Sequence, residues 1–131
     1  MADPVLSIVM PYRGKREIDL ALAVTTLIDV WQIREYRIPP LYSTGVRYRG
    51  ERCDAPFVPG ACERFLTAAQ GIIERWLDCD DLAPWRAAEL IVGGELTARP
   101  YCIPSEVGWH CLVERADGSI EDPSRVLGMK G

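Results

Sequence analysis

Three residues in the last third of the chain, Cys79, His110 and Asp122, are of the types that nucleophilic catalysis by a thiol requires. A cysteine attacks as its thiolate, an imidazole takes and returns a proton, and a carboxylate orients the imidazole. His110 is the only histidine of the sequence. The three residues therefore indicate a Cys-His-Asp catalytic triad, provided that the fold brings them together.

Cys79 is predicted to begin a helix that starts at Cys79 or Asp80 and stops at Gly93-Gly94, two glycines that follow the apolar repeat. The first amides of a helix favour a negative charge, and a neighbouring imidazolium does the same. Both effects lower the pKa of a thiol. We expect the imidazole to supply most of the activation.

Asp78, Asp80 and Asp81 oppose this effect, because nearby negative charges disfavour a thiolate. We expect them to point away from the sulfur or to be neutralised by Arg75 or Arg86. Asp78 is suited to cap the helix, and the other two acids to stabilise its dipole. Asp81 is also a secondary site candidate, since it lies close enough to hydrogen-bond a loop.

Whether Asp122 reaches His110 depends on the turn Ala116-Asp117-Gly118 between two predicted strands, which span residues 107–115 and 119–122. A two-residue loop would pair residue 116 with 119 and put the two side chains on opposite faces. A three-residue loop pairs 115 with 119 and makes Asp122 and His110 diagonal neighbours, roughly 7–8 Å apart at the backbone. Such a loop favours glycine at its third position, where Gly118 stands. The sequence thus predicts the three-residue loop and an imidazole–carboxylate contact.

The other elements are predicted from hydrophobic periodicity and from turn residues. We expect a strand over residues 6–11, a helix over 15–37, a long loop over 41–60 with a short strand at 45–49, a helix over 62–75 and a strand over 96–103. The first helix is expected to bury Leu20, Val24, Leu27, Ile28 and Trp31, with Asp29 off that face. Together these elements predict an α+β fold, with three helices packed on an antiparallel sheet of three or four strands.

Composition narrows the classes of function. The 131 residues are 48% hydrophobic and 26% charged, with a net charge of −4, as expected of a single soluble globular domain. An acidic chain argues against binding to nucleic acid or to an anionic membrane. We find no secretory signal and no apolar run long enough to span a bilayer. The five cysteines are odd in number, which favours a reducing cell interior.

Several other residues are candidates for secondary roles. The backbone amide of Cys79 is one expected oxyanion donor. Candidates for the second donor are Gln70, Trp76 and Trp31, among which the sequence does not choose. We expect the side chain of Trp109 to line one side of the site. Residues expected in structural roles are Trp31, Trp76 and Trp85 in the core, and Cys53, Cys62, Cys102 and Cys111 as inert thiols. No Cys-x-x-Cys or His-x-x-x-His spacing supports a zinc site, so neither a metal nor a cofactor is expected.

The motif Asp78-Cys79-Asp80-Asp81-Leu82-Ala83, together with Trp109-His110 and the run from Asp117 to Pro123, resembles the transglutaminase-like cysteine protease superfamily. The resemblance covers roughly residues 60 to 125 and is greatest to small bacterial and phage-encoded members. It implies a papain-like arrangement, in which a cysteine at a helix start packs on an antiparallel sheet. The nucleophile would be Cys79, the base His110 and the orienting acid Asp122.

The resulting hypothesis is a single domain over 1–131, with an N-terminal helix and long loop in 1–60 and a transglutaminase-like catalytic core in 61–131. Its function would be cysteine-dependent acyl transfer: hydrolysis of a peptide or carboxamide, or transamidation. The expected partners are a protein or peptide substrate and other virion proteins, in the cytoplasm of a bacterial host or in the virion. The alternative is a phage-type virion structural or adaptor protein whose transglutaminase-like fold is catalytically weak or inactive.

Overall fold

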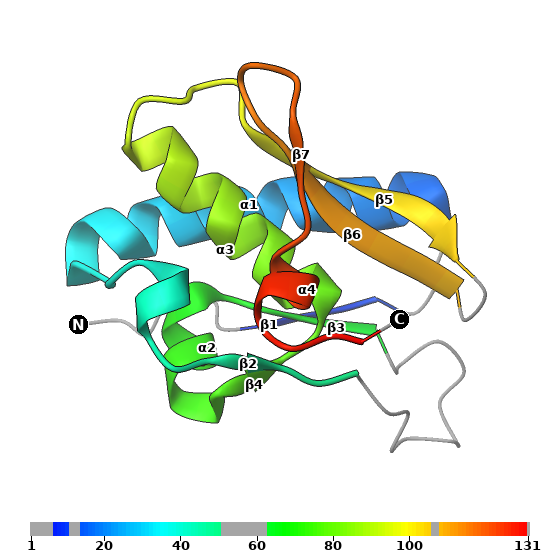
Figure 1. Ribbon diagram of the computed structural model, residues 1–131, viewed down its shortest axis with the longest axis horizontal. Helices are drawn as coiled ribbons and strands as arrows, with labels where there is room; N and C mark the ends of the chain where they lie inside the picture. Colours follow the sequence, from blue (N-terminus) through cyan, green and yellow to red (C-terminus); the bar gives the residue numbers. More distant parts are fainter. Residues whose placement is uncertain (1–6, 11–13, 51–62, 106–107, 131) are drawn as a thin grey trace.

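A computed structural model describes residues 7–10, 14–50, 63–105 and 108–130. Within these residues the fold is α+β, as predicted, but it contains four helices and three small sheets rather than three helices on one sheet (Figure 1). The helices are α1 (Lys15–Tyr36), α2 (Ala68–Glu74), α3 (Cys79–Val92) and α4 (Pro123–Val126), with a 3-10 helix η1 (Leu41–Ser43).

The described strands form three separate sheets. A two-stranded antiparallel sheet pairs β1 (Ser7–Met10) with β3 (Glu63–Leu66), and a two-stranded parallel sheet pairs β2 (Arg47–Tyr48) with β4 (Trp76–Leu77). The third sheet is antiparallel and has the order β5 (Arg99–Ser105), β6 (Gly108–Glu114), β7 (Ile120–Glu121). Figure 1 shows α3 in front of α1, with this sheet beside both helices and α4 near the start of α3.

The first and third predicted helices are confirmed to within a residue, whereas the second is wrong in its first part. Residues 63–66 form β3, and the helix begins only at Ala68. The difference is tertiary, because β3 hydrogen-bonds to β1, more than fifty residues earlier in the chain. The local pattern of apolar residues contains no information about a partner so distant in the sequence. The short strand predicted at 45–49 is found as β2, and α4 was not predicted.

The β6–β7 hairpin has the predicted register. Glu114 pairs with Ile120 and Val113 with Glu121, which corresponds to a three-residue loop. The amide of Arg115 donates to the carbonyl of Ser119 at 2.8 Å and closes the turn. Gly118 has a φ of +86°, in the left-handed region that favours glycine. The chain therefore returns with Asp122 on the side of His110.

The main core lies between α1, α3 and the β5–β6 pair. Small residues on α3, Ala83 and Ala87, are fully buried, and so are Phe65 of β3 and Val113 of β6. A second cluster surrounds Trp85 and joins α2, β4 and the C-terminal segment. Trp85 is thus in the core as predicted, but Trp31 and Trp76 are 47% and 54% exposed, so their assignment to the core was wrong.

Helix α1 buries the face opposite to the one predicted. Leu20, Leu27 and Trp31 are 65%, 70% and 47% exposed. The buried face consists of small, apolar and polar residues: Ile18, Ala21, Leu22, Thr25, Thr26, Asp29 and Gln32. Thr25 and Thr26 can be buried because their hydroxyls donate to carbonyls one turn earlier, at 2.8 and 2.7 Å. Small side chains on this face also suit close packing on the alanines of α3.

The buried acid and amide of α1 cap another helix. Asp29 Oδ1 accepts the amide proton of Ala68 at 2.7 Å, and Gln32 Oε1 accepts that of Ala69 at 2.9 Å. Gln32 also donates to the hydroxyl of Thr67 at 3.1 Å. These amides belong to the first turn of α2, where a helix has no internal acceptors. The polar residues of the buried α1 face therefore complete the start of α2.

Among the described residues, none of the helices combines the length and apolarity needed to cross a bilayer.

This capping role predicts how substitutions at Asp29 affect stability. Burial raises the pKa of Asp29 well above its ordinary value, so the site does not require a charge. Asp29→Asn retains the acceptor and should change the free energy of unfolding by less than about 1 kcal/mol, whereas Asp29→Ala leaves the Ala68 amide unpaired and should cost about 2 kcal/mol. Urea denaturation measures both. Equal losses for the two variants would contradict the capping role.

Candidate active site

The three predicted triad residues come from different elements that converge at the first turn of α3. Cys79 is the first residue of α3, His110 lies on β6, and Asp122 lies between β7 and α4. Helix α3 packs on β6, and the sulfur of Cys79 lies 4.0 Å from the carbonyl oxygen of Trp109, the residue before the histidine. The fold thus brings the predicted residues together.

His110 and Asp122 are in direct contact. Nε2 of the ring lies 2.8 Å from Oδ2 of the carboxylate, and the side chains are only 15% and 18% exposed. The second oxygen of Asp122 accepts the amide of Arg125 and so caps α4. The carboxylate is therefore held both by the backbone amide of Arg125 and by the imidazole of His110. Because Nε2 is engaged, Nδ1 is the ring atom left for Cys79.

The neighbours of Cys79 on β6 lower the pKa of its thiol. The thiol of Cys111, the ring of His110 and the backbone amide of Cys111 all stabilise its thiolate and lower the pKa of Cys79 to about 5, against the opposing effect of burial. The contact with Cys79 and the one with Asp122 raise the pKa of His110 to about 9, again against burial. Between these two values the stable form is a thiolate–imidazolium pair, which is the reactive form of a cysteine nucleophile.

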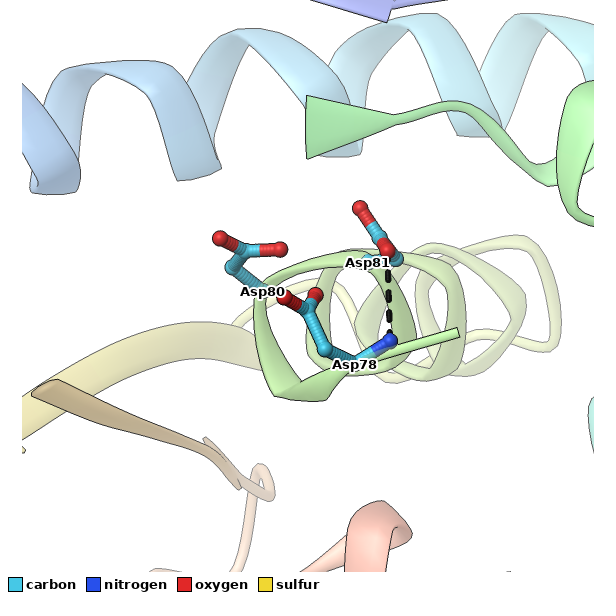
Figure 2. A group of neighbouring side chains, drawn as sticks. All are labelled: Asp78, Asp80 and Asp81. Carbon is cyan, nitrogen blue, oxygen red and sulfur yellow. Dashed lines mark hydrogen bonds between the residues drawn. The ribbon is translucent and has the colours of Figure 1, made fainter. Parts of the chain in front are cut away.

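The flanking acids lie together at the first turn of α3, as Figure 2 shows, and their burial favours the protonated forms of Asp78 and Asp80. Burial raises the pKa of Asp78 and of Asp80 well above the ordinary range, and each is raised further by a neighbouring carboxylate. Both shifts favour the protonated forms of these buried carboxyl groups. Neither Arg75 nor Arg86 forms an ion pair with these acids among the described residues, so that alternative was wrong. Arg86 instead binds Glu121 and Glu89.

Asp78 and Asp81 form a capping box at the start of α3, as expected for Asp78. Asp81 Oδ2 accepts the Asp78 amide at 3.3 Å, and Oδ1 accepts the amide of Leu66 at 2.6 Å. Figure 2 shows the hydrogen bond to Asp78. Burial raises the pKa of Asp81 to about 7, although these hydrogen bonds counteract it. Asp81 therefore ties α3 to β3 and positions the helix that carries Cys79.

The same three acids are also the only described group whose composition and spacing could hold a metal ion. One ligand atom from each lies within 4.8 Å of the others. Both oxygens of Asp81 are already bound to backbone amides. Asp81 is thus occupied by structural contacts, whereas Asp78 Oδ1 and Asp80 Oδ1 are buried and have no hydrogen-bond partner among the described residues.

The secondary candidates are distributed around the fold. Gln70 on α2 donates its amide to Glu74 at 2.9 Å, and Trp31 packs edge-to-face on Tyr36 on the outer side of α1. Trp76 is exposed on β4. Trp109 is half-buried and packs on the core beside Cys79. Cys102 is buried, as expected of a structural thiol, and Cys53 and Cys62 lie outside the described residues.

Sequence reasoning missed three contributors to the site. Cys111 was expected to be an inert thiol, yet its side chain lies close enough to Cys79 to lower the pKa of that thiol. Tyr48 lies within electrostatic reach, because burial and then the charge of Cys79 raise the pKa of its phenol. Glu121 precedes Asp122 and is held by the guanidinium of Arg86 at 2.5 Å, which fixes the return strand against α3. No sequence pattern identifies any of these contacts.

Comparison of the chain with protein-family models, with curated proteins and with solved structures gives no match. The functional argument therefore depends on the geometry and chemistry of the residues themselves.

The pKa of Cys79 predicts its reactivity. Alkylation by iodoacetamide, followed by mass spectrometry, should rise with a midpoint near pH 5. Cys111→Ala removes the largest stabilising contact and should shift this midpoint upward by about one unit or more. Cys102→Ala is the matched control, since that buried thiol contacts Asp19 rather than Cys79 and should leave the midpoint unchanged. A midpoint near that of an ordinary thiol in the unmodified protein would contradict the proposed ion pair.

Proposed function

We propose that this protein is a cysteine-dependent acyl-transfer enzyme that acts on a peptide or carboxamide and uses Cys79, His110 and Asp122 as a triad. The observation that carries the proposal is the convergence of a low-pKa thiol at a helix start with an imidazole that is hydrogen-bonded to a carboxylate at 2.8 Å. A structural cysteine needs neither partner. Proton-transfer groups arranged in this order around a thiol are the parts of a nucleophilic site.

In the first half of the reaction, the Cys79 thiolate attacks the substrate carbonyl and forms a carbon–sulfur bond. The resulting oxyanion is stabilised by the backbone amide of Cys79, one of the first-turn amides without a partner inside the helix. When the tetrahedral intermediate collapses, the carbon–nitrogen bond breaks and His110 gives its proton to the leaving amine. The product is a thioester on Cys79. Asp122 stabilises the imidazolium and holds the ring in place.

In the second half, His110 takes a proton from water or from an acceptor amine, which attacks the thioester. Collapse breaks the carbon–sulfur bond and regenerates the thiolate, and the proton remains on the imidazole. Water gives hydrolysis and an amine gives transamidation, so the same residues serve either outcome. The α+β fold and the cysteine at the start of α3 support a papain-like, transglutaminase-like arrangement for this core.

The proposal predicts selective labelling of one thiol. A cysteine-directed electrophile at neutral pH should modify Cys79 much faster than Cys102 or Cys111, because burial and a hydrogen bond keep those two thiols protonated. His110→Ala should reduce the Cys79 rate by at least roughly tenfold, since the imidazolium no longer supports the thiolate. Glu35→Gln, at an exposed position of α1, is the control and should have no effect. Equal labelling of all thiols in the unmodified protein would favour a structural or adaptor role.

The proposal also predicts a bell-shaped pH dependence of acyl transfer. Activity needs the thiolate and the protonated imidazole together, so it should rise through about pH 5 and fall through about pH 9. Release of an amine from peptide and glutamine-amide substrates, and incorporation of a fluorescent amine, measure hydrolysis and transamidation. Asp122→Asn should lower the rate at the optimum by roughly 100-fold or more. Activity that survives Cys79→Ala would exclude the mechanism.

A further inference from the structure

The outer face of α1 carries an unbroken apolar stripe. Leu20, Val24, Leu27 and Trp31 are 65%, 38%, 70% and 47% exposed. Their alternating spacing of four, three and four residues is that of a coiled-coil seam, and it spans about 16 Å of helix. The opposite face of α1 packs on α3 and β5, and Figure 1 shows α1 as the layer behind α3. The stripe is therefore outside the core of its own chain.

The ends of this stripe carry opposite charges. Glu17 precedes it by one seam position and Arg34 follows it by one, so the seam continues as a charged residue at each end. Neither forms an ion pair with another described residue, and Lys15 and Asp19, which flank Glu17 in sequence, pair with each other. The seam is thus apolar in the middle, acidic at its N-terminal end and basic at its C-terminal end.

This pattern is complementary to itself when two copies of α1 run antiparallel. If the twofold axis passes between Val24 and Leu27, these two residues face each other across the seam, and Leu20 faces Trp31 of the other copy. The same axis brings Glu17 opposite Arg34 at both ends. A parallel pair would instead set Glu17 against Glu17 and Arg34 against Arg34, which is repulsive.

We propose that α1 is a homodimerisation surface, through which two copies of this chain associate by antiparallel packing of Leu20, Val24, Leu27 and Trp31, with Glu17–Arg34 ion pairs at both ends. A second copy fits better than a strongly charged partner, because the charges that border the stripe are balanced. A twofold interface also uses the same patch on both chains, as this palindromic pattern requires. The proposal does not depend on the catalytic role of Cys79.

Sedimentation velocity of the full chain over a range of concentrations tests this proposal. We expect a reversible monomer–dimer equilibrium. Leu27→Glu, which places two charges at the centre of the seam, should raise the dissociation constant at least roughly 100-fold. Leu96→Glu is the matched control, because Leu96 is 76% exposed in the segment between α3 and β5 and should leave the equilibrium unchanged. Leu20→Glu serves as a second seam variant, and circular dichroism confirms that each variant is folded.

A charge exchange tests the antiparallel arrangement. Glu17→Arg alone should weaken the dimer by on the order of tenfold, and adding Arg34→Glu should restore it. A chain that stays monomeric at every concentration would overturn the proposal, as would a dimer insensitive to both seam variants. A dimer that depends on the seam but is not restored by the exchange would overturn the antiparallel pairing.

Discussion

The contact between Asp122 and His110 is the interaction on which the site depends, and it exists because of how one turn is built. A loop one residue shorter would rotate every side chain of the return strand to the other face of the sheet. Gly118 allows the three-residue loop by adopting a positive φ. The ion pair between Glu121 and Arg86 then holds the strand against α3, and α4 starts at once so that Asp122 is also a helix cap. The position of the carboxylate is thus determined by several independent constraints.

The second constraint is electrostatic. A thiolate at the start of α3 would be unfavourable beside three ionised aspartates. Burial removes this conflict, because it costs more to ionise Asp78 and Asp80 than to leave a proton on the pair. A negative charge at this helix start is then most stable on Cys79, where Cys111 and His110 lower the pKa of the thiol. Protonated acids and an ionised thiol beside one another are a consequence of unequal solvation and hydrogen bonding.

The two faces of helix α1 have different roles, one in the core of the chain and one at its surface. Its inner face contributes Asp29 and Gln32 to the first turn of α2, and its small residues let α3 approach closely. Its outer face carries large apolar side chains that the chain itself does not cover. The helix therefore has polar residues within its buried face and large apolar residues on its exposed face. The polar residues of the inner face have hydrogen-bond partners at the start of α2, and the apolar residues of the outer face are those of the proposed dimer.

Local patterns in the sequence were sufficient for the elements that act through their neighbours along the chain. The start and end of α3, the length of α1, the loop around Gly118 and hence the pairing of His110 with Asp122 follow from capping, periodicity and turn preferences. Tertiary structure alone decided the rest. The face that α1 buries, the pairing of β3 with β1, the protons on the acids and the approach of Cys111 to Cys79 all depend on groups far apart in sequence. Periodicity reports that a helix has an apolar side, but it cannot report whether that side meets the core or another molecule, because burial is a property of the assembled chain.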